Sequence, residues 1–191
     1  MRSYLHLIKT ITDHSRGNPE APRVMIEIGT TREILEGHDS TPVLHEFCID
    51  NNINFTTVDM DPDNTSNIKN RIPDINAVTS KGENFLRDFK GSIDYIYLDA
   101  FDFYHENHSQ DRIDKYKTIL NKTINNSDCH QMHLDCCINM LNKLSPNCVI
   151  TFDDVLNDSF DGKGKTAIPF LLNNGFKVFS LIDQSCTLMR A

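Results

Sequence analysis

Short apolar runs alternate with longer amphipathic segments along most of this chain. The runs have the length of buried strands and occur at 23–29, 54–60, 76–80, 94–101, 147–154, 176–182 and 186–190. Segments with a helical pattern occur at 4–12, 42–52, 129–144 and 166–175. A repeated strand–helix order predicts an α/β fold, in which a mostly parallel sheet carries helices on both faces. Only three residues separate the last two runs, which predicts an antiparallel hairpin at the end of the sheet.

Capping and turn residues predict where two of the helices begin and end. Thr41 followed by Pro42 is typical of an N-cap and a first helical turn, so the 42–52 helix is expected to open there. The 129–144 helix is expected to stop at Ser145 and Pro146, because proline cannot continue a helix.

The composition fits one globular domain over 1–191, with 1–22 as a short N-terminal helical segment. Hydrophobic residues make up 39% of the chain and charged residues 24%. A net charge of -8 argues against a nucleic acid or an anionic membrane as partner, since both bind clustered lysine and arginine. No segment approaches the roughly 20 apolar residues of a membrane span. We expect a cytoplasmic protein with a small-molecule substrate, folding alone or as a homo-oligomer, whose six cysteines are buried free thiols.

Acidic residues end four of the first five main strands. They are Glu27, Asp59, Asp99 and the pair Asp153 and Asp154. Ligands of open parallel sheets bind at the carboxyl ends of the strands, and carboxylates crowded at that edge repel unless a cation or hydrogen-bond donors offset them. The pattern therefore predicts a functional site at this edge.

The spacing resembles that of the class I S-adenosylmethionine-dependent methyltransferases, over about 24–190. Glu27-Ile28-Gly29 is similar to the E/D-x-G motif whose backbone lies against the methionine part of the cofactor. Asp59 matches the acidic residue that accepts bonds from the ribose hydroxyls. The resemblance implies a Rossmann-like seven-stranded sheet of order 3-2-1-4-5-7-6 with an antiparallel last strand, and S-adenosylmethionine as cofactor.

The same resemblance implies further cofactor contacts. The family's additional glycines are absent after Gly29, where Thr30, Thr31 and Arg32 follow and the next glycine is Gly37. The other residues expected at the cofactor are Thr30, Ser40, Thr41, Gly82, Glu83 and Asp99. Ser40 and Thr41 would lie beside the methionine carboxylate at a helix N-terminus, which favours anions.

Asp99, Asp153 and Asp154 resemble the D…DD set of divalent-metal-dependent O-methyltransferases of the catechol and sugar types. Oxygen ligands suit Mg²⁺, which would lower the pKa of a hydroxyl on a small polar substrate such as a sugar or polyol. Consecutive strand residues point to opposite faces, so both members of the pair can bind only if the chain has begun to turn. Asp102, His105 and His108 are the candidate bases.

Alternative interpretations remain. An NAD-binding domain is disfavoured because G-x-G-x-x-G is absent, and Cys129 with His133 does not complete a zinc site. The GKGKT segment lacks the preceding strand of a phosphate loop, so Lys163 and Lys165 are expected to shape the mouth of the site. Two functional alternatives stay open: a metal-independent methyltransferase acting on an amine or peptide, and a non-catalytic methyltransferase-like binding module.

Overall fold

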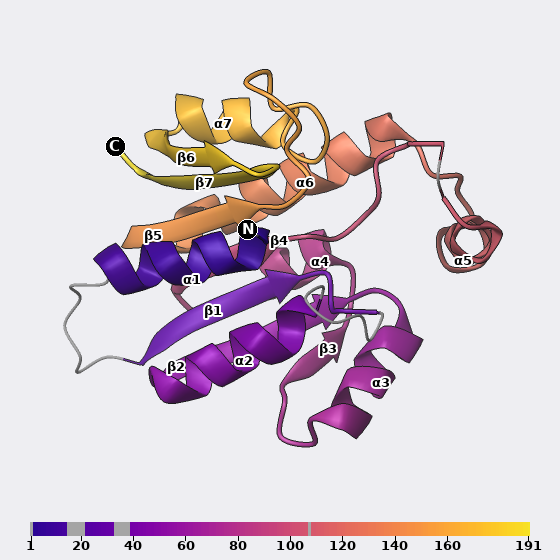
Figure 1. The fold of residues 1–191 in the computed structure, drawn as a ribbon, viewed down its shortest axis with the longest axis horizontal. Helices are drawn as coiled ribbons and strands as arrows, with labels where there is room; N and C mark the ends of the chain where they lie inside the picture. The colour runs from indigo at the N-terminus through magenta and orange to yellow at the C-terminus, as the bar shows by residue number, and fades with distance from the viewer. Residues whose placement is uncertain (1, 15–21, 33–38, 107) are drawn as a thin grey trace.

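The computed structural model of this chain describes residues 2–14, 22–32, 39–106 and 108–191. Its strands are β1 (Arg23–Ile28), β2 (Ile53–Asp59), β3 (Ala77–Thr79), β4 (Ile93–Leu98), β5 (Leu144–Phe152), β6 (Phe176–Ile182) and β7 (Ser185–Arg190). They pair in the order β3-β2-β1-β4-β5-β7-β6, and β7 runs antiparallel to both of its neighbours (Figure 1). The predicted order and the antiparallel hairpin are confirmed.

Helices cover both faces of this sheet. They are α1 (Ser3–His14), α2 (Ser40–Asp50), α3 (Pro62–Arg71), α4 (Gly82–Asp88), α5 (Gln110–Leu120), α6 (Asn126–Met140) and α7 (Ala167–Asn173), with a 3₁₀ turn η1 (Leu141–Lys143). α1, α2 and α3 pack on one face and α4, α6 and α7 on the other. None of the described helices is long and apolar enough to cross a bilayer.

The alternation of side chains along β1 connects the core to the site. Ile26 and Ile28 belong to the core beneath α4, α6 and α7, whereas Met25 packs with α1 and α2. Successive strand residues point to opposite faces, so Glu27 shares the face of Met25. The carboxylate of Glu27 is therefore buried against α2 rather than presented to solvent.

Two predicted helix ends are wrong. α2 begins at Ser40, so Thr41 is its second residue and not its N-cap, because the Thr41 hydroxyl donates to Glu27 instead of capping the helix. α6 ends at Met140, and β5 already begins at Leu144. The Lys143 ammonium donates to backbone carbonyls of α4 and α6 in this short connection, which ends the helix before Ser145.

The helix predicted at 4–12 and the prediction of buried free cysteines are confirmed. α1 spans Ser3–His14 and buries Leu7 and Ile11 against the sheet. All six cysteines are free and buried. Residues 33–38 of the loop after Gly29, Gly37 among them, lie outside the described residues.

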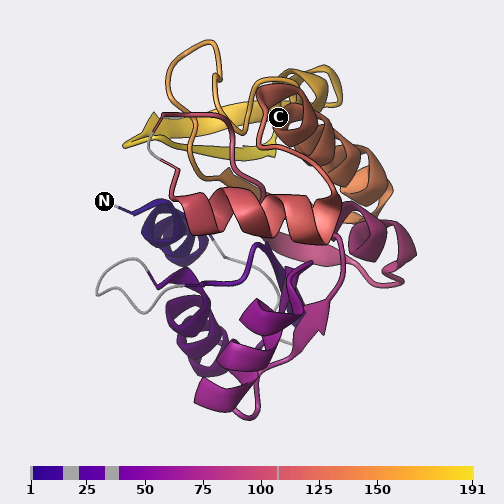
Figure 2. The ribbon, with the colours of Figure 1, turned by 90° about the vertical axis from the view of Figure 1, so that its right-hand side faces the viewer.

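α5 stands apart from both helical layers. It lies beyond the carboxyl ends of the parallel strands, as the two views show (Figures 1 and 2). Lys115 in α5 forms an ion pair with Asp61 after β2 at 2.7 Å, and Tyr116 accepts a hydrogen bond from the Asp102 backbone after β4. These contacts fix α5 over the edge where the sequence predicts the site.

Candidate active site

A cavity of about 530 Å³ opens at the carboxyl ends of β1, β2, β4 and β5. Residues after each of these strands line it, and α5 and α6 close it from outside. Of the strand-end carboxylates, Asp59, Asp99, Asp153 and Asp154 line the cavity, whereas Glu27 lies behind its wall. The edge predicted from the sequence is therefore hollow and acidic.

Glu27 is fully buried and is held by three hydroxyl groups. Ser40 donates to Oε1, and Thr41 and Thr57 donate to Oε2, each at 2.7 Å. Burial raises the pKa of Glu27 to about 7, and the three hydroxyl donors oppose that rise. Glu27 thus joins β1, β2 and the start of α2, and its role in the described structure is to support the cavity wall.

Glu27 should make folding stability depend on pH. Its folded-state pKa of about 7 lies above the 4.5 of a free glutamate, so the folded chain holds this proton more tightly than the unfolded chain. The resulting stability is present below about pH 4.5 and is lost as pH rises to about 7, by roughly 3 kcal/mol. Urea unfolding of the unaltered chain and Glu27→Gln across this range measures the difference.

The matched control is Glu46→Gln, which changes an exposed carboxylate of α2. The free-energy difference between the unaltered chain and this control should stay constant across the same pH range. A difference that is equally constant for Glu27→Gln would show that Glu27 keeps its ordinary pKa in the folded chain.

Gly29 and Gly82 are required by packing within the protein. Gly29 has φ +108°, and a Cβ there would lie 2.7 Å from backbone atoms of Asp99 and Ala100. A Cβ on Gly82 would lie 2.4 Å from Cγ2 of Ile28. Both glycines line the cavity, but the close approach that each permits is to another part of the chain.

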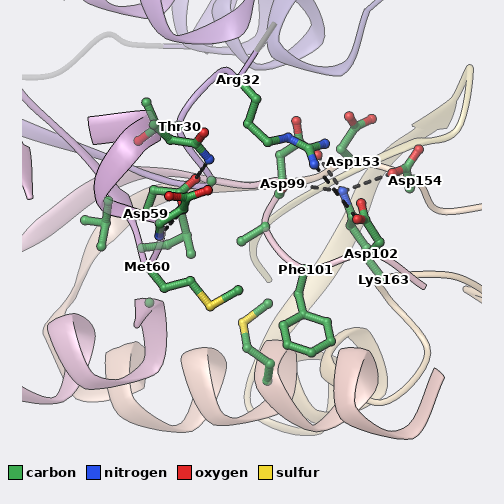
Figure 3. A pocket seen from close by; sticks show the side chains of 18 of the residues that line it. Thr30, Arg32, Asp59, Met60, Asp99, Phe101, Asp102, Asp153, Asp154 and Lys163 are labelled. Atoms are coloured by element: carbon green, nitrogen blue, oxygen red, sulfur yellow. Dashed lines mark hydrogen bonds and ion pairs between the residues drawn. The ribbon is translucent and has the colours of Figure 1, made fainter. Parts of the chain in front are cut away.

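Asp59 presents a partly satisfied carboxylate to the cavity (Figure 3). Oδ1 accepts from the Asp61 backbone at 2.8 Å and Oδ2 from Asn64 at 3.1 Å. Burial raises the pKa of Asp59, opposed by these two donors. A carboxylate has about four acceptor positions, so further donors can still bind. Met60, Phe101 and Met132 supply apolar wall beside it.

The hydroxyl groups on either side of the loop after β1 already take part in hydrogen bonds within the protein. Ser40 and Thr41 each donate their one hydroxyl hydrogen to Glu27, so neither hydroxyl is free to donate to a cofactor carboxylate. Thr31 and Thr41 exchange two further bonds at 2.8 and 3.0 Å, and Thr30 pairs with Thr57 at 2.7 Å. Thr30 and Ser40 line the cavity, and Thr41 does not.

The structure brings Asp99, Asp153 and Asp154 together. One oxygen of each lies within 4.8 Å of the others. Asp154 has φ +51°, so the chain has begun to turn, which is the condition for both members of the pair to face one site. Asp153 makes no hydrogen bond or ion pair with any other described residue through its carboxylate. Its oxygens are open to the cavity.

A lysine occupies the centre of this acidic group. Lys163 Nζ lies 2.5 Å from Oδ1 of Asp99 and 2.9 Å from Oδ2 of Asp154, and its side chain is 3% exposed (Figure 3). Burial acts to lower the pKa of Lys163, but Asp99, Asp154 and Asp153 outweigh it and the pKa is raised. The attraction of Lys163 also lowers the pKa of Asp154. The ammonium is thus a permanent charge.

The sequence reasoning missed this role of Lys163, which was expected only at the mouth of the site. The chain leaves β5, turns between Val155 and Gly162, and returns Lys163 beside Asp154. Lys165 is the residue that lies outside, 44% exposed and paired with Asp161. The glycine on each side of Lys163, nine residues after Asp154, was the available signal.

Solved structures share this architecture, although no known protein-family profile and no curated protein matches the chain. One is SMU.1697c from Streptococcus mutans, described as a putative methyltransferase in complex with SAH. Its sequence identity to this chain is 8% and its TM-score is 0.58, and the similarity covers 100% of this chain and 99% of that protein. Another, described as a putative rRNA methylase from Clostridium thermocellum, has 8% identity and a TM-score of 0.60. The similarity covers 100% of this chain and 98% of that protein. The fold is that of class I S-adenosylmethionine-dependent methyltransferases.

A third structure with this methyltransferase fold contains a metal. MycE, a methyltransferase from the mycinamycin biosynthetic pathway in complex with Mg and SAH, has 10% identity and a TM-score of 0.59. The similarity covers 98% of this chain and 49% of MycE.

Of the three candidate bases, only Asp102 lines the cavity. Its Oδ2 accepts from Arg112 Nε and lies 3.9 Å from Arg32, so it is already paired with guanidinium groups. The rings of His105 and His108 stack on each other at 3.7 Å and do not line the cavity. The structure therefore favours none of the three as the base.

Glu83 and His133 remain to be placed. Glu83 lines the cavity from the first turn of α4. His133 lies fully buried in α6, where Nδ1 bonds to the Cys129 carbonyl at 2.8 Å, and burial lowers its pKa to about 3. Within the described part of the chain, the three aspartates are the only group of three or more potential metal ligands.

Proposed function

We propose that this chain is an S-adenosylmethionine-dependent methyltransferase acting on an amine or hydroxyl of a small polar molecule. The observation that carries the proposal is the Asp59 carboxylate at the end of β2, which keeps acceptor capacity toward the cavity beside Met60. A ribose diol can donate two hydrogen bonds to such a carboxylate. The fold shared with methyltransferases supports the same assignment.

The acceptor end of the cavity is the edge at β4 and β5. Bound S-adenosylmethionine would supply the methyl group. The Asp153 carboxylate, which makes no hydrogen bond or ion pair with another described residue, is suited to accept a hydrogen bond from the N–H or O–H of the acceptor and to orient its lone pair. Asp99 and Asp154 are neutralised in part by Lys163 and are less available.

The Mg²⁺ expected from the D…DD pattern does not fit this site. One oxygen of Asp99 and one of Asp154 already bind the Lys163 ammonium, which occupies the centre of the acidic group. We therefore assign no step to a metal, and the proposal takes the metal-independent alternative. The acceptor is proposed to be a small molecule, because a net charge of -8 opposes binding of a phosphate backbone.

The test is transfer of a labelled methyl group from S-adenosylmethionine to a panel of amino sugars, sugars, polyols and short peptides. We expect transfer to at least one acceptor, at an unchanged rate in excess EDTA. Asp153→Asn should lower kcat/KM for that acceptor by 10- to 100-fold, because it removes a charged hydrogen-bond acceptor. Asp158→Asn, an exposed change in the following loop, is the control and should leave the rate unchanged.

Two results would contradict the proposal. Loss of transfer in EDTA, with recovery in Mg²⁺, would restore the metal-dependent O-methyltransferase interpretation. Cofactor binding without transfer to any acceptor would favour the non-catalytic binding module.

A further inference from the structure

Backbone contacts as well as side-chain contacts fix the position of Lys163. The Lys163 backbone N–H donates to the Asp154 carbonyl at 3.1 Å, and Val155 and Gly162 form an isolated bridge beside it. Gly162 has φ +87°, and a Cβ there would lie 2.1 Å from the Asp154 carbonyl oxygen. No residue but glycine fits this turn, so the chain brings Lys163 back to the acidic pair in one fixed register.

The side chain of Lys163 reaches from this turn into the acidic group. Nζ also lies 3.3 Å from the Asp99 backbone carbonyl, so all its identified partners are oxygens of Asp99 and Asp154. A divalent ion held by the three aspartates would lie among these same carboxylates, whose ligand oxygens are all within 4.8 Å of one another. An ammonium and a metal ion among the same carboxylates repel each other, and water screens this repulsion poorly at Lys163, whose side chain is 3% exposed. The two cations are mutually exclusive.

We infer that Lys163 is a built-in cation that takes the place of a divalent metal in this cavity. The unaltered chain then binds no divalent metal at Asp99, Asp153 and Asp154, and loss of the lysine charge creates a metal site there. Lys163 is a positioning residue in this account: it holds Asp99 and Asp154 so that Asp153 is left for the acceptor. The inference rests on the proposed function for this last role alone.

Metal binding is measured without turnover, so the inference and the proposed function can fail separately. The probe is Mn²⁺, which accepts oxygen ligands and whose free ion gives an electron paramagnetic resonance signal that is lost on binding. We expect Lys163→Met, which keeps the length and removes the charge, to bind Mn²⁺ at least about 10-fold more tightly than the unaltered chain. Adding Asp153→Asn to this variant should abolish the gain.

The matched control is Lys165→Met, two residues along the same loop, which removes an exposed lysine paired with Asp161. It should leave Mn²⁺ affinity unchanged. The thermal midpoint of Lys163→Met should rise with Mn²⁺, whereas those of the unaltered chain and the control should not.

Two outcomes overturn the inference. One is a folded Lys163→Met variant with no gain in Mn²⁺ affinity. The other is Mn²⁺ binding by the unaltered chain that Asp153→Asn abolishes. This second measurement does not require Lys163→Met to fold, and absence of such binding in the unaltered chain supports the inference.

Discussion

Replacing Gly29 by alanine is expected to lower the free energy of unfolding by about 4 kcal/mol. The new Cβ would lie 2.7 Å from three backbone atoms of Asp99 and Ala100, none of which can rotate away. The residue would also have to keep φ +108°, which an L side chain disfavours. The end of β1 would move relative to β4 at the centre of the cavity. Urea denaturation measures the loss.

Gly175→Ala separates the two causes. Gly175 also has a positive φ, +82°, but a Cβ there has nothing within 4 Å. Alanine at this position has the unfavourable positive φ but no steric clash, so the free energy of unfolding should fall by about 1 kcal/mol. Equal losses in the two variants would show that Gly29 is not packed against the β4 end as described.

The fold was predictable because its pattern is local. Apolar runs of strand length between amphipathic segments define a parallel α/β sheet, and the short gap between the last two runs, two residues between β6 and β7 in the structure, defines its hairpin. The start of α2 was mispredicted for a tertiary reason. Thr41 has the right chemistry for an N-cap, but a buried carboxylate on β1 competes for its hydroxyl hydrogen.

The site was predictable where strand ends deliver its residues. Asp59, Asp99, Asp153 and Asp154 reach the cavity because each lies at the carboxyl end of a parallel strand or within two residues of it. Partners that arrive from loops were not predictable in this way. Lys163 reaches Asp99 from 64 residues away through a turn whose shape depends on Gly162, and Arg112 reaches Asp102 from α5.

The face of β1 to which Glu27 points decides whether its side chain reaches the cavity. A glutamate two residues before a glycine resembles a cofactor-binding motif, yet Glu27 shares the face of Met25 and meets hydroxyls of α2 and β2. The strand therefore buries its acidic group behind the cavity wall. Its neighbours Gly29 and Thr30, beyond the end of β1, are the ones that line the cavity.

Asp59→Asn is expected to weaken binding of S-adenosylhomocysteine by at least about 100-fold. The substitution removes the charge that would hold the ribose hydroxyls, and hydrogen bonds to charged groups contribute roughly 1.5–3 kcal/mol each. Asparagine keeps the size of the side chain, and its single oxygen can keep the bond from the Asp61 backbone N–H, whereas the bond from Asn64 is lost. Asp63→Asn is the control, since the Asp63 side chain is 76% exposed on α3.

Isothermal titration of the unaltered chain, Asp59→Asn and Asp63→Asn with S-adenosylhomocysteine shows whether the cavity binds the cofactor through Asp59. We predict one binding site per chain in the unaltered protein and in Asp63→Asn, with equal affinity, and a loss of at least about 100-fold in Asp59→Asn. No heat of binding in the unaltered chain at millimolar ligand, or equal affinity in all three proteins, would contradict the assignment of this cavity to the cofactor.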